Sequence, residues 1–249
     1  MERLLQATLN IVRSRGEQLF IDVSKPYAYT LVARFDDKKY LMKVASDAEE
    51  VPNSALKDLK LISRYTDVSS ICVVSGVKGQ ILQRSVIYLK DNVAFMSLST
   101  FTDILNGEEP TFRVSRGAVT AMIDGGKLRE RREQAGMSLG ALAEELGVTR
   151  ETVYRYERGE IEAPLRVAEK LIRMFGPDVI RRINIWKRPE ITREELRSRQ
   201  MAKETYRLVE SHPDAIRVES RVIFVSASRE KYEKTVELAN VLDVEVDKM

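Results

Sequence analysis

The first 112 residues alternate between short apolar runs and amphipathic segments. Helical spacing predicts helices near 2–15, 52–64 and 101–107, and runs rich in β-branched and aromatic residues predict strands between them. The predicted strands cover residues 18–23, 29–35, 39–45, 71–76, 86–91 and 93–97. This succession of helices and strands predicts an α/β domain in which helices flank a mixed sheet.

The central part of the chain has helical periodicity. Residues 139–146 form a predicted helix that Ser138 can cap, because its hydroxyl accepts from an N–H group that the first turn leaves unpaired. Gly147 ends this helix, since glycine adopts the left-handed conformation of a tight helix exit. The apolar positions of this helix are Leu139, Leu142, Ala143 and Leu146.

A second helix follows at once. Thr149 can cap it, Val153 and Tyr156 point to its inner side, and Gly159 ends it. Two short helices joined by a glycine turn are the helix-turn-helix pattern. Many such pairs serve only packing, so the pattern alone does not establish DNA binding.

A third helix precedes this pair, over residues 127–134. Leu128 is its inner residue and Gly136 ends it. Arg132 is placed to meet Glu157 across the bundle, and a buried pair of this kind fixes the relative position of two helices more than it adds stability. The three helices predict a small all-α domain.

The C-terminal part of the chain combines a long polar segment with a strand-helix-strand pattern. Pro189 precedes a predicted long helix from Thr192 to about Ser211, although its apolar positions are sparse. The remaining residues predict a small β-α-β region, either a separate domain or one that docks on the first. The predicted division is 1–112 for the α/β domain, 113–126 for a linker, 127–188 for the helix-turn-helix domain and 189–249 for the C-terminal region.

Composition narrows the class of protein. At 249 residues and 43% hydrophobic content, the chain can build two or three domains with real cores, and no apolar run approaches the ~20 residues that a membrane helix needs. The lone cysteine, Cys72, lies in an apolar run, which indicates a buried inert thiol in a reducing compartment. We therefore expect a cytoplasmic protein, and the 32% charged content hints at a thermophilic source.

The charge of the chain is unevenly distributed. Residues 113–188 hold 16 Lys and Arg against 11 Asp and Glu, a local net charge of +5, whereas the remaining residues carry −2. A basic excess that coincides with the helix-turn-helix region fits a phosphate-binding surface, although the acidic residues are interleaved. The outward side of the second helix is formed by Arg150, Glu151, Tyr154 and Arg155, with Arg158 at its end.

The stretch AGMSLGALAEELGVTRETVYRYERGE, with the helix before it, resembles the phage-repressor/Cro class of helix-turn-helix domain over about residues 120–175. The matching residues are Leu128, Arg132, Gly136, Leu142, Ala143, Gly147, Val148, Val153, Glu157 and Gly159. Leu139 departs from the pattern, because the family often has a DNA-contacting glutamine there. The resemblance implies an archaeal-type multidomain transcriptional regulator.

The resemblance implies specific roles for the second helix. Early residues of that helix touch bases in the family, and the corresponding residues here are Arg150, Glu151 and Arg155. We expect phosphate contacts from Thr149, Arg158 and Arg131. The family's arginine–glutamate bridge falls on Arg132 and Glu157.

The layout of the first domain weakly resembles the archaeal Holliday-junction resolvases of the restriction-endonuclease-like fold. Those nucleases hold Mg²⁺ with a strand carboxylate and an acid-x-Lys motif on the next strand. Here Leu41 stands in the acid position before Lys43, and the preceding strand offers no acid until Asp36. Asp22 lies on a neighbouring strand without a second carboxylate at the required place. We therefore expect no metal, no cofactor and no catalytic residue.

Three functions remain open from the sequence. The first is a sequence-specific transcriptional regulator that binds double-stranded DNA as a homodimer, since one recognition helix reads only a few base pairs. The second is a DNA-targeted nuclease, against which the missing acid argues. The third is an adaptor whose helix-turn-helix binds another protein, which the exposed arginines disfavour. No pattern indicates a small-molecule effector.

Overall fold

The computed structural model describes residues 2–15, 18–23, 27–35, 38–115, 117–186 and 189–248. Its chain forms two compact units. The larger unit contains residues 1–82, 89–102 and 185–249, and the smaller unit contains residues 83–88 and 103–184. In the described part of the chain, no helix is both long enough and apolar enough to cross a bilayer.

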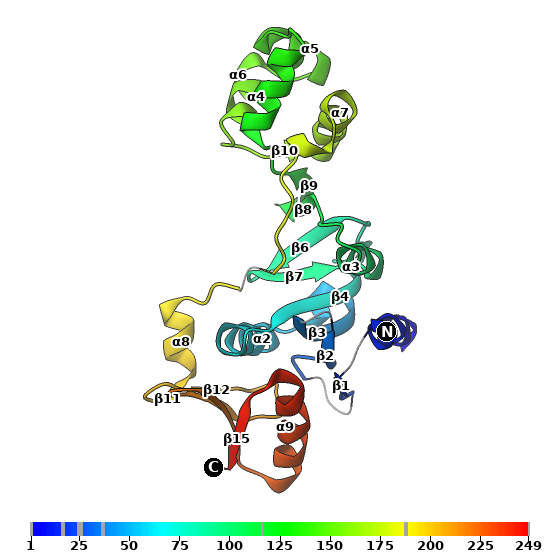
Figure 1. Ribbon diagram of the computed structural model, residues 1–249. Coiled ribbons are helices and arrows are strands. Elements are labelled where there is room, and N and C mark those ends of the chain that lie inside the picture. Colours follow the sequence, from blue (N-terminus) through cyan, green and yellow to red (C-terminus); the bar gives the residue numbers. More distant parts are fainter. Residues whose placement is uncertain are drawn as a thin grey trace. The chain divides into compact units, whose positions relative to one another are not determined.

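A mixed sheet forms the centre of the larger unit (Figure 1), in the strand order β1-β2-β3-β4-β7. Its strands are β1 (Gln18–Ile21), β2 (Leu31–Phe35), β3 (Lys38–Asp47), β4 (Ser69–Val77) and β7 (Val93–Met96), and β5 (Gln80–Ile81) pairs with β4. The β1/β2 and β2/β3 pairs are antiparallel, whereas β3/β4 and β4/β7 are parallel. The predicted α/β domain with a mixed sheet is confirmed.

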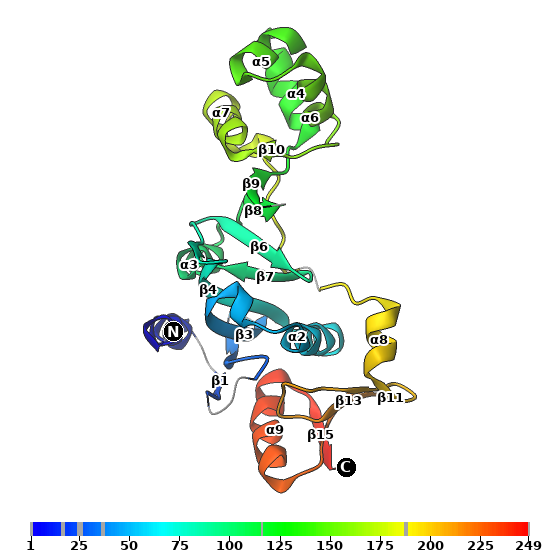
Figure 2. The ribbon, with the colours of Figure 1, turned by 180° about the vertical axis from the view of Figure 1, so that it is seen from behind.

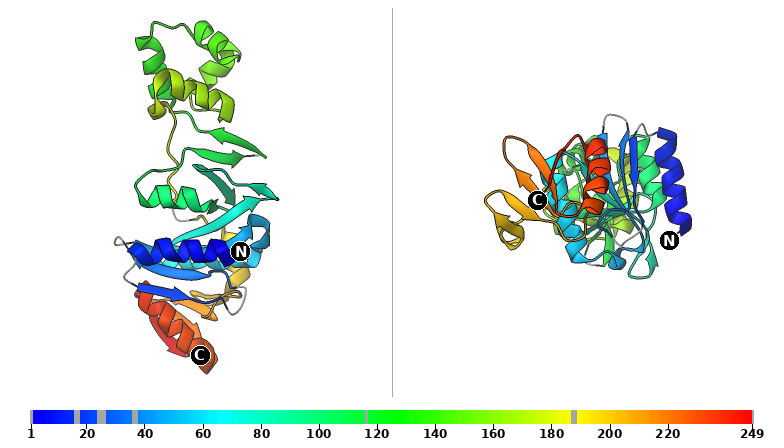
Figure 3. Two further views of the ribbon diagram at one scale, coloured as in Figure 1. Left: turned by 90° about the vertical axis from the view of Figure 1, so that its right-hand side faces the viewer. Right: turned by 90° about the horizontal axis from the view of Figure 1, so that it is seen from below.

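Helices cover both faces of this sheet. Helix α1 (Glu2–Arg15) packs against β3 (Figure 3, left, with α1 in blue), and α2 (Asn53–Thr66) packs against β4 and β7 from the opposite side (Figure 1). This double cover explains why residues 70–74 of β4 are all buried, a run typical of a parallel strand inside an α/β layer structure. Cys72 is among them, and burial raises the pKa of its thiol, so the predicted inert cysteine agrees with the structure.

The C-terminal region belongs to the larger unit. Its second sheet has the order β11-β12-β13-β14-β15, and α9 (Arg229–Leu242) packs on β14 and β15 (Figure 2). These strands are β11 (Gln200–Ala202), β12 (Thr205–Arg207), β13 (Ala215–Val218), β14 (Val222–Ser226) and β15 (Glu245–Lys248). Helix α9 also packs against β1 and β2. The region therefore docks on the first domain, one of the two arrangements left open by the sequence.

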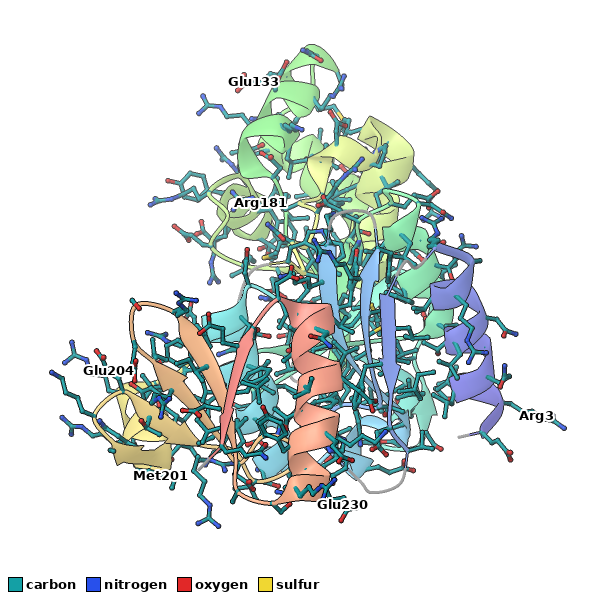
Figure 4. All side chains as sticks on the ribbon, turned by 60° about the horizontal axis from the view of Figure 1, so that its bottom comes forward. Arg3, Glu133, Arg181, Met201, Glu204 and Glu230 are labelled. Carbon is teal, nitrogen blue, oxygen red and sulfur yellow. The ribbon has the colours of Figure 1, made fainter. Side chains whose placement is uncertain are left out.

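The long helix predicted from Thr192 to Ser211 is wrong. Helix α8 covers only Arg193–Arg199, and the chain then forms the β11–β12 hairpin, on which Figure 4 labels Met201 and Glu204. The sparse apolar positions give a longer helix no continuous face to bury. As a strand, by contrast, Tyr206 pairs with Ile216 of β13 and stacks on Tyr65, with the ring centroids 5.3 Å apart.

A buried carboxylate helps to dock the C-terminal region. Asp58 of α2 is fully buried, and its Oδ2 accepts from the backbone N–H groups of Val209 and Glu210 and from the hydroxyl of Ser211. Arg199 lies 3.4 Å from its Oδ1. Several donors thus compensate the cost of burying this charge.

The described residues of the smaller unit form short helical segments and a small set of strands. Its helices are α4 (Gly125–Gln134), α5 (Leu139–Leu146), α6 (Arg150–Glu157) and α7 (Leu165–Phe175), followed by the 3₁₀ turn η2 (Pro177–Val179). The strands are β8 (Phe112–Ser115), β9 (Ala118–Ala121) and β10 (Ala163–Pro164), and residues 86–88 of β6 (Val86–Lys90) pair with β8.

Residues 113–126 do not form the predicted linker. Strands β8 and β9 pair as a hairpin, α4 begins at Gly125, and Ala121 and Ile123 are buried in the helical core. The backbone N–H of Arg181 donates to the carbonyl of Met122 at 2.8 Å, which ties the end of the unit to the hairpin exit. These pairings join residues far apart in the sequence, so local composition did not reveal them.

Candidate nucleic-acid interface

The helix-turn-helix is built on caps and glycine exits. The hydroxyl of Ser138 accepts from the N–H of Ala141, and that of Thr149 accepts from the N–H of Thr152, both at 3.1 Å. Gly147 has φ +69°, the left-handed conformation in which a side chain is disfavoured. The predicted starts of α5 and α6 and the turn between them are confirmed.

A single apolar core holds the three helices together. It consists of the buried residues Ala121, Ile123, Leu128, Leu142, Ala143, Leu146, Val153, Tyr156, Ala163, Val167, Ala168, Leu171, Val179 and Ile180. Leu139, where the resembling family often has glutamine, packs partly buried against this core. Its side chain therefore stabilises the fold.

Helix α6 presents a polar face to solvent. Because Val153 and Tyr156 point inward at helical spacing, the residues between them point outward. The exposed residues on and beside α6 are Thr149, Arg150, Glu151, Tyr154, Arg155 and Arg158. Tyr154 is 42% exposed, so this face combines guanidinium groups with an accessible aromatic ring.

The predicted base-contact residues differ in how they are held. The side chains of Arg150 and Glu151 make no hydrogen bond or ion pair with the residues that the structure describes. The Nε of Arg155 lies 3.7 Å from a carboxylate oxygen of Glu160. The structure therefore brings all three residues to one side of α6, with Arg150 free to move and Arg155 beside an acid.

The predicted phosphate-contact residues already have protein partners. Thr149 caps α6 with its hydroxyl. Nε of Arg158 forms an ion pair with Glu160 at 2.8 Å, and its Nη1 donates to the hydroxyl of Tyr154 at 3.1 Å. Arg131 lies on α4 and forms a 2.8 Å ion pair with Asp178, a hydrogen bond that lowers the pKa of this carboxyl. Phosphate binding by Arg131 would require this pair to open.

The pair of Arg132 and Glu157 joins α4 to the last turn of α6. Nε of Arg132 lies 2.5 Å from Oε1 of Glu157 and Nη2 lies 3.2 Å from Oε2, a two-point contact. Nη1 of Arg132 also donates to the carbonyl of Met137 at 2.8 Å. The side chains of Arg132 and Glu157 are only 10% and 8% exposed, and the hydrogen bond to Glu157 raises the pKa of Arg132.

Arg181 is a candidate contact that the sequence did not single out as a site residue. Its Nη2 lies 3.6 Å from the position that a Cβ would occupy on Gly159, at the C-terminal end of α6. Figure 4 shows the side chain of Arg181 on the surface of the smaller unit. Arg181 follows α6 by more than twenty residues, and long-range contacts such as its backbone bond to Met122 bring it back, so no local signal indicated it.

Gly125 lies where α4 comes close to the end of α6. It is buried in the first turn of α4, and a Cβ there would lie 2.1 Å from the carbonyl oxygen of Glu157. Glycine is required at this position because α4 and the end of α6 approach each other backbone to backbone.

In the larger unit, the residues that correspond to the acid-x-Lys motif of the nucleases are not arranged to bind a metal ion. Leu41 is fully buried, and the ammonium of Lys43 donates to the carbonyl of Tyr27 while burial lowers its pKa. Asp22 is also buried, 3.1 Å from Nε2 of His212, and Asp36 lies outside the described residues. Across the described ranges, no cluster of three His, Cys, Asp or Glu is placed to hold a metal ion. The residues do not fit the magnesium site of this nuclease fold.

Comparisons with known proteins agree with both units. Residues 1–110 match the family described as a PD-(D/E)XK superfamily domain, and residues 128–177 match the family described as helix-turn-helix. Both resemblances drawn from the sequence are thereby confirmed, as is the fold class. No solved structure matches the chain.

Relatives carry the same kind of name. A protein of Pyrobaculum aerophilum, provisionally named an HTH-type transcriptional regulatory protein, is 63% identical over 248 residues, which cover 100% of this chain and 99% of that protein. Similarly named proteins of Methanococcus maripaludis and Archaeoglobus fulgidus are 30% and 31% identical over 66% and 65% of this chain. The matches span 51% and 52% of those two proteins, so this chain covers about half their length.

Proposed function

Because the chain belongs to the family of archaeal HTH-type transcriptional regulatory proteins, we propose that it regulates transcription by binding specific DNA sequences. The observation that carries the proposal is the exposed face of α6, with three arginines and Glu151 on an otherwise well-packed helix-turn-helix. The local net charge of +5 over residues 113–188 supports an anionic partner. We expect this activity in the cytoplasm.

The proposed binding mode places α6 in the major groove. Arg150, Glu151 and Arg155 read base edges, because guanidinium groups recognise guanine and carboxylates accept from cytosine. Thr149 and Arg158 contact DNA phosphates at the two ends of α6. Arg131 adds a phosphate contact when its ion pair with Asp178 opens. Two chains bind together as a homodimer, since a single recognition helix covers too few base pairs for a specific site.

Selection of bound duplexes from a random pool, followed by sequencing, tests this function. We expect an enriched palindrome whose half-sites lie about one helical turn apart. A pool without enrichment would contradict sequence-specific binding, and a single unrepeated half-site would contradict the dimer.

Replacing Arg150 with alanine is expected to weaken binding to the selected site by roughly 1–3 kcal/mol, the usual contribution of an arginine that contacts a base. The reason is that the Arg150 side chain is exposed and makes no hydrogen bond or ion pair with the described part of the protein, so it is available to a base. Fluorescence anisotropy with the labelled site measures the loss. Arg173→Ala, a change on the exposed side of α7, is the charge-matched control, and equal affinities of parent and Arg150→Ala would exclude Arg150 as a base contact.

We propose further that the larger unit does not cleave DNA. Leu41 occupies the place of a metal-binding acid and is sealed in the sheet, and Lys43 is held by a backbone carbonyl. We expect plasmid and four-way-junction DNA to remain intact in the presence of Mg²⁺ or Mn²⁺. Metal-dependent cleavage that persists in a Lys43→Ala chain would indicate contamination, and cleavage lost in that variant would contradict the proposal.

A further inference from the structure

The residue after the glycine exit of α6 has a fixed position. Gly159 has φ +66°, its N–H donates to the carbonyl of Tyr156 at 2.9 Å, and the N–H of Glu160 donates to the carbonyl of Arg155 at 3.0 Å. These two bonds form a Schellman motif, which turns the chain back over the last helical turn. The side chain of Glu160 is therefore directed toward the residues of that turn.

The carboxylate of Glu160 lies between two arginines. Its Oε1 is 2.8 Å from Nε of Arg158, and its Oε2 is 3.7 Å from Nε of Arg155. In both pairs the shortest contact is to the Nε atom of the guanidinium group. Arg158 is held further by Tyr154, whose ring centroid lies 5.5 Å from its guanidinium carbon. One acid thus orients two of the proposed DNA contacts.

We propose that Glu160 determines the DNA specificity of this chain by positioning Arg155 and Arg158. The inference rests on the proposed function and adds a residue to the same site. A guanidinium group that is already oriented by a nearby carboxylate loses less conformational freedom when it binds a guanine edge or a phosphate. Glu160 lies outside α6 and is a positioning residue.

The same carboxylate discriminates against non-cognate DNA. Both pairs are substantially exposed, since the side chains of Arg155, Arg158 and Glu160 are 47%, 57% and 40% exposed, so each pair is weak enough to rearrange. On a non-cognate duplex Arg155, the proposed base contact, has only phosphates to bind, and the nearby negative charge opposes that contact. On the cognate site the oriented guanidinium groups meet their partners. Glu160 therefore raises the ratio of cognate to non-cognate affinity.

The test compares Glu160→Gln with the parent as full-length chains. Anisotropy is measured with two labelled duplexes, the site that the parent selects from a random pool and a duplex of scrambled sequence. We expect the ratio of the two affinities to fall by about tenfold, comparable to the loss of one well-placed contact. Cognate binding should weaken and scrambled binding should strengthen. Circular dichroism should show the fold unchanged, because the replaced pairs are on the surface.

Glu169→Gln provides the charge-matched control, since Glu169 is exposed on α7 and pairs with no residue in the described part of the chain. This change alters net charge equally and should shift both affinities together, leaving their ratio unchanged. In an Arg155→Gln/Arg158→Gln background, Glu160→Gln should no longer change the ratio. If the parent prefers the selected site and Glu160→Gln shows the same ratio of cognate to scrambled affinity, this inference is overturned and the proposed function stands. If neither chain prefers the selected site, the proposed function fails together with it.

Discussion

Replacing Arg132 with alanine is expected to lower the free energy of unfolding of the smaller unit by about 3–5 kcal/mol, the usual cost of removing one member of a buried ion pair. The loss arises because the carboxylate of Glu157, whose side chain is only 8% exposed, would remain buried without the guanidinium group that contacts both of its oxygens. The carbonyl of Met137, which follows the exit of α4, would also lose its donor. The pair thus connects α4, its exit and the end of α6.

Hydrogen exchange of peptides from α4, α5 and α6 measures this loss, because it reports the opening of the smaller unit within the intact chain. Arg129→Ala is a matched control on the same helix. Arg129 pairs with Glu133 at 2.9 Å, but both side chains are more than half exposed, so we expect a change of at most about 0.5 kcal/mol. Similar losses in the two variants would contradict the assigned role of Arg132.

The helix-turn-helix could be predicted from sequence because its signals are local. Ser138, Thr149 and Gly147 act within three or four residues of their own position, and the structure has their caps and exit where the pattern indicates them. The inward positions follow from helical periodicity, which depends only on the chain itself. The order of helices and strands in the first domain could be predicted for the same reason.

Elements that depend on distant partners were not predictable in this way. Residues 200–207 form strands because β13 and Tyr65 supply hydrogen bonds and an aromatic face, neither of which is adjacent in sequence. Strands β8 and β9 form a hairpin that pairs with residues 86–88 and with β10. Periodicity depends only on the segment itself. The sequence therefore predicted a long helix for residues 192–211 and a linker for residues 113–126.

The candidate site shows the same division. The exposed face of α6 follows from its own sequence, but the partners of its arginines do not. Asp178 reaches Arg131 through the fold of α7 and η2, and Arg181 comes to the end of α6 through its bond to Met122. Glu160 was close in sequence, yet its direction follows from the glycine-dependent backbone turn. Roles inferred by residue type alone therefore overlooked which arginines are already paired.

Replacing Gly125 with alanine is expected to destabilise the smaller unit by about 3 kcal/mol, the upper part of the range for overpacking. The new Cβ would lie 2.1 Å from the carbonyl oxygen of Glu157 and 2.8 Å from that of Tyr156. Both neighbours are backbone atoms in the last turn of α6, so no flexible side chain can yield. The end of α6 would have to move away from α4, and this movement would also strain the contact between Arg132 and Glu157.

Substitution of the adjacent Gly126 distinguishes the effect of the close backbone contact at Gly125 from the effect of helix propensity. Gly126 is also in the first turn of α4, but the nearest atom to a Cβ there is Oδ1 of Asp124 at 3.7 Å, an ordinary contact. Gly126→Ala should therefore stabilise the unit by up to about 1 kcal/mol, because alanine loses less backbone entropy in a helix. Opposite signs for the two substitutions in hydrogen exchange would attribute the effect to the backbone approach at Gly125. Two stabilising substitutions would mean that α4 and α6 are not in contact there, and the support that Arg132 gives to the DNA-binding helix would then need another explanation.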